Sequence, residues 1–313
     1  MSAPLLIVNP SSGRERAAEH ADTVGAALRR RFGDLLVIET AGNADAENAG
    51  REAARRGCTM LFVAGGDGTL NETINGVASA GALARVRFGV LPLGTGNDFA
   101  AALGIPLEIP DAVDVLLAGR ELRVDVGVVN GRCFLNTSGG GYIAEVSVAV
   151  TPQLKTLAGR LAYLIGGAQA LFEYEPVRAT VTTEPRGLRI GLGLYTFAVC
   201  NSRLIGGGRL IAPAAVIDDG LLDVCLIEAM TAVEFVALAR KVADGAHLDD
   251  PRVRYLQASS VTFELDRETR INTDGEVLSA IHAEYSVLPR AATFFAGVSP
   301  FAAAVQRPHR GER

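Results

Sequence analysis

The segment Gly65–Glu72 (GGDGTLNE) constrains this chain most, because it joins an apolar strand-like run to a helix-like one. Met60–Ala64 is apolar throughout, and Leu70, Ile74 and Val77 recur at helical spacing. A glycine-rich turn at such a junction lets backbone N–H groups approach a phosphate, and the helix N-terminus behind it adds partial positive charge. The segment therefore predicts either a phosphate site or a tight strand-to-helix turn in which glycine supplies a positive φ.

Asp67 lies at the centre of this turn. A carboxylate repels phosphates unless a divalent cation stands between them, so Asp67 indicates a Mg²⁺-nucleotide rather than a bare phosphate. The alternative is that Asp67 only caps the following helix.

Strand-like and helix-like segments alternate from residue 4 to about residue 120, which predicts a parallel sheet with helices on both faces. Ligands of such sheets bind at the carboxyl ends of the strands. Three more loops at strand ends are rich in glycine or hydroxyl residues: 9–13 (NPSSG), 40–46 (TAGNADA) and 92–99 (PLGTGNDF). Each alone is typical of a capped turn, but four such loops after four successive strands predict one nucleotide site.

From about residue 122 the apolar pattern changes to a period of two, and Asn130-Gly131 is a strong hairpin signal. This part predicts an antiparallel sandwich or barrel with helices inserted near residues 231–244 and 154–173. The helix at 154–173 is predicted to pack in the core, and the alternative is that it lines an acyl-chain cleft or contacts a bilayer. The predicted strands cover residues 177–183, 190–200, 221–228, 253–265 and 285–288. The predicted domains are 1–122, with 290–305 as a candidate addition, and 123–289, followed by a disordered tail at 306–313.

Two acidic turns stand out in the second half. Asp218-Asp219-Gly220 can form a hard oxygen site with neighbouring backbone carbonyls, or an ordinary solvated turn. Asp274-Gly275 is typical of a type I′ turn, which leaves Glu276 available to accept a proton from an attacking hydroxyl.

The composition excludes several classes of protein. A formal charge of −5 argues against nucleic-acid binding, and four histidines without an HExxH motif argue against zinc chemistry. The four cysteines show no CxxC spacing, and three lie in apolar strand-like runs, which predicts buried, reduced thiols. No apolar run reaches the roughly 18 residues of a membrane span, and the N-terminus fits a first strand rather than a signal peptide. We therefore expect a cytoplasmic protein that contacts the inner face of a membrane peripherally at most.

Together these motifs resemble the diacylglycerol kinase catalytic-domain family, specifically its soluble bacterial lipid kinases, in the family's order from residue 5 to about 290. GGDGT is shared with NAD kinases and phosphofructokinases. The match is narrowed to lipid kinases by the first loop, by PLGTGNDFA and by the DDG and DGE turns. Arg14, where relatives often carry lysine, and Ala101, where many carry arginine, depart from the pattern. The resemblance implies a phosphofructokinase- and NAD-kinase-like α/β domain, a C-terminal antiparallel β-sandwich domain, and an active site between them.

The resemblance also implies a role for each motif. Glu276 would be the general base, and Asp67 would join a metal–water–phosphate network. Mg²⁺ would be held by the Asp219 carboxylate and the carbonyls of Val216 and Leu221. ATP would contact the residues of four loops: Asn9, Pro10, Ser11, Ser12, Gly13, Thr40, Gly65, Gly66, Asp67, Gly68, Thr69, Leu70, Asn71, Glu72 and Thr95.

These roles predict ATP- and Mg²⁺-dependent phosphorylation of a lipid hydroxyl, diacylglycerol-like by default, at a membrane surface. Two alternatives stay open: an NAD kinase-like enzyme, which would share Asp67 and its glycines, and a nucleotide-binding regulatory protein without catalysis. A homodimer also stays open, because nothing in the sequence indicates an oligomeric state.

Overall fold

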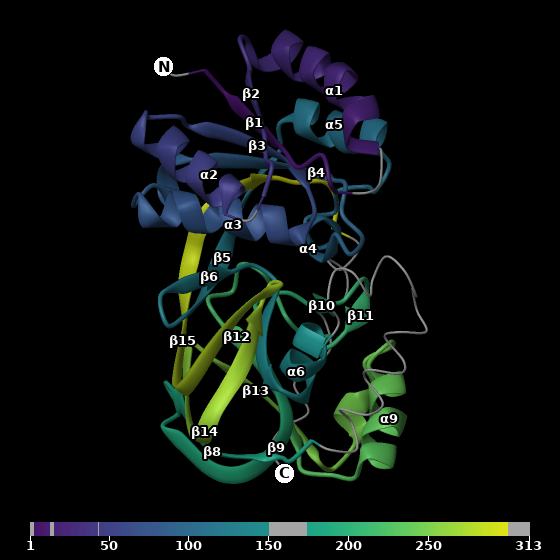
Figure 1. The fold of residues 1–313 in the computed structure, drawn as a ribbon, viewed down its shortest axis with the longest axis vertical. Coiled ribbons are helices and arrows are strands. Elements are labelled where there is room, and N and C mark those ends of the chain that lie inside the picture. Colours follow the sequence, from purple (N-terminus) through teal and green to yellow (C-terminus); the bar gives the residue numbers. More distant parts are fainter. Residues whose placement is uncertain (1–2, 13–15, 43, 150–173, 300–313) are drawn as a thin grey trace. The chain divides into compact units, whose positions relative to one another are not determined.

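The computed structural model of the chain describes residues 3–12, 16–42, 44–149 and 174–299 (Figure 1). The helix predicted near residues 154–173 and the predicted tail at 306–313 lie outside these ranges. Within them, no helix is both long and apolar enough to cross a membrane.

Contacts divide the chain into two compact units. The first unit contains the chain up to Asp125 and from Arg290 onward, together with the short segment Val216–Asp219. The second contains Val126–Ala215 and Gly220–Pro289. The sequence pattern assigns residues 216–219 to the second domain, so the observed division differs at this segment.

Hydrogen bonds explain why Val216–Asp219 belongs to the first unit. The backbone N–H of Asp125 donates to the carbonyl of Ile217 at 2.7 Å. Arg290 donates from Nε to the carbonyl of Asp218 at 3.2 Å and from its backbone N–H to Asp125 Oδ1 at 2.6 Å. The segment is thus bonded to Asp125, the last residue before the second unit begins, and to Arg290, the first residue after it ends.

The sheet of the first unit is built from parallel strands in the order β2-β1-β3-β4. Strands β1 and β3 are buried along their whole length, as expected for parallel strands covered on both faces. The end of β15 (Glu276–Phe295) extends this sheet, since Thr293 and Phe294 pair in parallel with β4. The other bounds are β1 (Leu5–Val8), β2 (Leu36–Glu39), β3 (Met60–Gly65) and β4 (Arg87–Pro92).

Helices lie on both faces of this sheet. Figure 1 shows α1 and α5 on one face and α2 and α3 on the other. Helices α4 and α5 are not among the elements that the sequence pattern predicts. The bounds are α1 (Arg16–Phe32), α2 (Asp45–Arg55), α3 (Asp67–Ser79), the 3₁₀ helix η1 (Leu83–Arg85), α4 (Asp98–Ala102) and α5 (Ile109–Ala118).

The core of the first unit contains aromatic side chains from distant parts of the sequence. The rings of Phe62 and Phe295 stack with centroids 6.0 Å apart, and those of Phe88 and Phe294 with centroids 5.2 Å apart. All four side chains are buried. The end of β15 therefore contributes to the first unit's core as well as to its sheet, although the rest of this strand belongs to the second unit.

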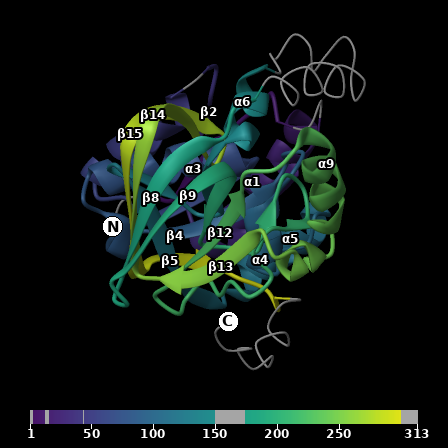
Figure 2. The same cartoon turned by 90° about the horizontal axis from the view of Figure 1, so that it is seen from below.

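The second unit is an antiparallel β structure with inserted helices, in agreement with the predicted period-two pattern. Strand β9 pairs with β12, β7 and β8, and β14 pairs with β15, β7 and β8. Figure 2 shows β14, β8, β9, β12 and β13 following one another around this unit. The bounds are β5 (Glu121–Val129), β6 (Arg132–Phe134), β7 (Thr137–Gly141), α6 (Tyr142–Ala149), β8 (Val177–Glu184), β9 (Leu188–Cys200), β10 (Leu204–Ile205), β11 (Arg209–Leu210), β12 (Leu222–Glu228), α9 (Ala232–Lys241), the 3₁₀ helix η2 (Ala246–Asp249), β13 (Val253–Ala258) and β14 (Ser260–Thr273).

The prediction of one strand over residues 253–265 is wrong. The chain changes partners at Ser259, because β13 pairs with β12 whereas β14 pairs with β8 and β15. The backbone N–H of Ser259 donates to the carbonyl of Glu184 at this point. The predicted strand at 285–288 is likewise only part of the much longer β15.

The four cysteines are buried free thiols, which confirms the expectation from their spacing. Burial raises the pKa of Cys133 to about 11 and that of Cys225 to about 12. These two side chains are thus protonated thiols at neutral pH and serve as small apolar groups of the β structure.

A buried histidine makes the stability of the second unit pH-dependent. His247 is fully buried, its Nε2 lies 3.1 Å from the carbonyl of Ile211, and burial lowers its pKa below 6.5. As the pH falls, the histidine binds a proton in the unfolded protein before it does so in the folded protein. Its contribution to stability is therefore fully present above about pH 6.5 and declines below that pH. We expect His247→Gln to unfold with a flatter pH dependence between about pH 5 and pH 8 in urea titrations. An unchanged slope would contradict this assignment.

Candidate active site

Asn9 connects the first loop to helix α3. Its Nδ2 donates to Thr69 Oγ1 at 2.9 Å, and its Oδ1 accepts the backbone N–H of Ser11 at 3.0 Å. Pro10 and Ser11 are exposed, Ser12 is half-buried, and Gly13 lies outside the described residues. The NPSSG run is therefore a turn built by Asn9, and the same side chain fixes this turn against the GGDGT segment.

Glycines bring the third and fourth loops into backbone contact. A Cβ atom on Gly94 would lie 2.4 Å from the Cα of Gly66, and one on Gly65 would lie 2.7 Å from the Cβ of Thr69. Real Cβ atoms do not approach other atoms so closely, so these positions require glycine. A Cβ on Gly68, in contrast, would meet nothing within 4 Å.

The Asp67 carboxylate also joins these two loops. It accepts the backbone N–H groups of Asp98 and Phe99, each at 3.1 Å, and so caps helix α4. Asn97, at a φ of 54°, closes the same loop through two hydrogen bonds between its side-chain amide and the backbone of Gly94. The sequence pattern misses these roles of Asn97 and Asp98, although a polar Asn-Asp pair before an apolar run is a helix-start signal.

The remaining predicted nucleotide contacts lie in different environments. Thr40 is buried directly after β2, and the N-cap residue of α2 is Ala44. The Asp45 carboxylate accepts the backbone N–H groups of Ala41 and Gly42 in the loop between them. The side chains of Leu70 and Asn71 are buried, that of Glu72 is half-buried, and Thr95 is exposed on the fourth loop.

The N-terminus of α3 fits a phosphate group. Its N-cap residue is Gly66, which has no side chain to cap the first turn, and a Cβ on Gly68 would meet nothing within 4 Å. A 13-residue helix that begins in this way presents backbone N–H groups and its positive end, which is the arrangement that binds phosphates in proteins.

Alanine substitutions at Gly94 and Gly68 are expected to have different effects on stability. We expect Gly94→Ala to lower the free energy of unfolding by about 1–3 kcal/mol, because its Cβ would collide with the backbone of Gly66. Gly68→Ala serves as the matched control, since it adds a Cβ in open space within a helix and should be neutral or stabilising by about 0.4–1 kcal/mol. Urea denaturation measures both changes. Equal effects would show that the two loops do not touch as described.

The predicted metal ligands lie on one short turn, residues 216–221. Gly220 has a φ of 76°, and the Asp219 side chain is exposed. Hydrogen bonds to Asp125 and Arg290 use the carbonyls of Ile217 and Asp218, which are not in the predicted ligand set. One carboxylate with two carbonyls is the hard-oxygen chemistry that Mg²⁺ takes with added waters. The described residues contain no group of three or more His, Cys, Asp and Glu side chains that could hold a metal.

Glu276 begins β15 and pairs with Thr273 across the hairpin turn. Its Oε2 lies 2.5 Å from Nη2 of Arg132, and both side chains are about one-third exposed. No sequence signal identifies Arg132 as this partner, because 144 residues separate the two. The structure thus places the predicted base in a partly exposed ion pair within the second unit.

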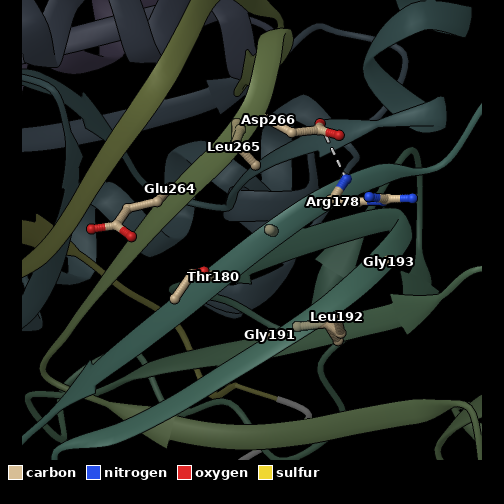
Figure 3. A pocket seen from close by; sticks show the side chains of 9 residues that line it. Arg178, Thr180, Gly191, Leu192, Gly193, Glu264, Leu265 and Asp266 are labelled. Carbon is tan, nitrogen blue, oxygen red and sulfur yellow. Dashed lines mark hydrogen bonds between the residues drawn. The ribbon is translucent and has the colours of Figure 1, made fainter.

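A pocket of about 560 Å³ lies on the outer face of β8, β9 and β14 in the second unit (Figure 3). Gly191 and Gly193 of β9 line it, and Figure 3 shows Asp266 beside the backbone of Arg178, with Glu264 further along the same strand as Asp266. None of the predicted site residues lines this pocket. We therefore do not assign the predicted chemistry to it.

Both parts of the chain match known protein families. Residues 3–129 match the diacylglycerol kinase catalytic domain, and residues 138–296 match the YegS C-terminal NAD kinase beta sandwich-like domain. The second match confirms the β-sandwich architecture predicted for the C-terminal domain, and the two together confirm the two-domain organisation.

Similar proteins cover nearly the whole chain. A diacylglycerol kinase of Bacillus subtilis (strain 168) is 33% identical over 93% of this chain and 95% of its own length, and one of Staphylococcus carnosus (strain TM300) is 32% identical over 90% of each. A crystal structure of a candidate diacylglycerol kinase from Bacillus anthracis str. Sterne, 27% identical, superposes with a TM-score of 0.79 over 94% of this chain and 95% of that one. The chain therefore belongs to the diacylglycerol kinase catalytic-domain family and is a kinase.

Proposed function

We propose that this kinase transfers the γ-phosphate of ATP, with Mg²⁺, to the hydroxyl of a lipid, with diacylglycerol as the default acceptor. The observation that carries the proposal is the contact of three loops around the glycine-capped N-terminus of α3. The two relatives at 32–33% identity, which are diacylglycerol kinases, support the choice of acceptor.

The first unit would bind the polyphosphate. Backbone N–H groups at the start of α3 would take a phosphate, and Asn9, Thr40 and Thr95 would contact the nucleotide from neighbouring strand ends. Asn9 and Asp67 fix the loops in advance through their hydrogen bonds to Thr69 and to the start of α4. Such preorganisation matters because phosphoryl transfer depends on alignment more than on covalent help.

The turn at residues 216–221 would hold the metal through the Asp219 carboxylate and the carbonyls of Val216 and Leu221. Bound Mg²⁺ would supply charge neutralisation between Asp67 and the phosphates.

Glu276 would act as the general base. The acceptor oxygen attacks the γ-phosphorus, its new O–P bond replaces the bond to the β-phosphate oxygen, and ADP leaves. The hydroxyl proton passes to the Glu276 carboxylate. Arg132 binds Oε2, so Oε1 is the oxygen that we assign to this proton transfer.

A lipid acceptor lies in a membrane, so we further propose that the protein works peripherally at the cytoplasmic face. The test is transfer of label from γ-labelled ATP with Mg²⁺ to a panel of detergent-dispersed lipids and, separately, to NAD. A labelled lipid supports the proposal. Labelled NADP would favour the NAD kinase-like alternative, and saturable ATP binding without any product would favour a regulatory protein.

A further inference from the structure

Asp274, which by sequence is only a hairpin-turn residue, contacts a second loop. Its carboxylate accepts three consecutive backbone N–H groups: Leu135 at 2.6 Å, Asn136 at 3.1 Å and Thr137 at 2.9 Å. In return, its own backbone N–H donates to the carbonyl of Thr137 at 3.1 Å. A type I′ turn needs none of these bonds, since it requires only positive φ at its two central residues.

The loop that Asp274 binds is itself fixed. Leu135 and Asn136, which connect β6 to β7, and Thr137, the first residue of β7, are all buried. The carbonyl of Asn136 accepts the backbone N–H groups of Asn201 and Ser202, and the Ser202 hydroxyl donates to Asn136 Oδ1 at 2.9 Å. The Asp274 carboxylate is therefore attached to a rigid part of the second unit rather than to a mobile loop.

Glu276 depends on this attachment because it follows Asp274 by two residues. The turn places Asp274 at a φ of 47° and Gly275 at 102°, and Glu276 is the first residue of β15 after it. Arg132, which binds the Glu276 carboxylate, lies at the start of β6, three residues before the bound loop. The backbone and the carboxylate of the base are thus both held by the same segment, residues 132–137.

We propose that Asp274 is a positioning residue for the base. Its carboxylate fixes the turn to residues 135–137, and Arg132 from the same segment orients the Glu276 carboxylate. This inference rests on the proposed role of Glu276. It assigns to Asp274 an effect on turnover that a pure turn residue would not have, because a displacement of about 1 Å at a reacting group can cost about 100-fold in rate.

Asp274→Asn separates the two roles. Asn-Gly is among the dipeptides most favoured in a type I′ turn, so the hairpin is retained. An amide has one acceptor oxygen, and its own N–H groups would face at least one backbone N–H of residues 135–137, so the attachment is weakened. The matched control is Asp266→Asn: Asp266 also lies on β14 and accepts a single backbone N–H, from Arg178 at 3.2 Å, on the outer face shown in Figure 3.

The readouts are turnover with the panel lipid that the wild type labels fastest, the KM for ATP, and amide hydrogen exchange. We expect Asp274→Asn to lower kcat about 10- to 100-fold at an unchanged KM for ATP. Exchange at Leu135, Asn136 and Thr137 should accelerate in this variant alone. Asp266→Asn should match the wild type in all three measurements.

A double variant shows whether Asp274 acts through the base. If it does, Asp274→Asn combined with Glu276→Gln is no slower than Glu276→Gln alone. Effects that multiply, or a folded Asp274→Asn with wild-type kcat, would overturn the positioning role while leaving the base assignment intact. A Glu276→Gln enzyme with normal turnover would overturn both.

Arg132→Gln supplies a second test that leaves the turn untouched. It removes the cation from Glu276, so we expect a lower kcat, partly restored in Arg132→Lys, which keeps the charge without the planar fork. Equal, wild-type turnover in both variants would contradict the proposal.

Discussion

Glu276→Gln is expected to lower kcat by about 10²- to 10⁴-fold without changing the affinity for ATP. Glutamine keeps the size of the side chain and an oxygen that can accept from Arg132, so the hairpin and the hydrogen bond persist. Only the ability to take a proton is lost. Single-turnover label transfer measures the chemical step, and calorimetric titration with ATP measures binding.

Glu284→Gln is the matched control for this substitution. Glu284 lies on the same strand, is more exposed than Glu276, and interacts with His282 rather than with an arginine. We expect its turnover to equal that of the wild type. Near-normal turnover in Glu276→Gln would show that another group, or water, takes the proton.

The order of elements could be predicted well because it depends on local pattern. The alternation of apolar runs with helical periodicity identifies β1 to β4 and the helices between them. The period-two pattern around Asn130-Gly131 likewise identifies the β5–β6 hairpin. Both signals lie within a few residues of the structure that they specify.

The pairing of the strands and the assignment of segments to the two units could not be predicted, because both depend on contacts between residues distant in sequence. Nothing local to Ser259 shows that the chain leaves β12 for β8 there. The segment Val216–Asp219 belongs to the first unit through bonds to Asp125 and Arg290, which lie about 70 to 90 residues away.

The candidate site shows the same limit at the level of single side chains. The glycines and Asp67 of the third loop are visible in the sequence because their spacing is local. The contact of Gly66 with Gly94, the capping of α4 by Asp67 and the ion pair of Glu276 with Arg132 all join residues that are far apart in the sequence. The sequence therefore predicts which residues carry the chemistry, and the fold shows which residues hold them in place.

Asp67 caps α4 and, in the proposed mechanism, also supplies a negative charge beside the metal, and substitutions can separate these two functions. As a cap, its carboxylate accepts the N–H groups of Asp98 and Phe99; as a charge, it would face the metal and the phosphates. Asp67→Asn keeps one acceptor oxygen and loses the charge, whereas Asp67→Ala loses both. We expect both variants to lose at least about 100-fold in kcat. Asp67→Ala should lose the roughly 0.5–2 kcal/mol of stability typical of a missing cap, and Asp67→Asn, which keeps one of the two accepted N–H groups, should lose less.

Thr231→Ala calibrates the cost of a cap that has no part in catalysis. Thr231 caps α9 and accepts the backbone N–H of Glu234, so its removal should lower stability by a similar amount and leave kcat unchanged. Denaturant titration and turnover assays on the three variants compare the two effects directly. If Asp67→Asn retained wild-type turnover, the charge would have no catalytic role, and Asp67 would serve only to join the third loop to α4. If it lost turnover while losing less stability than Thr231→Ala, the negative charge itself would be required, as expected when a cation lies between this carboxylate and the phosphates.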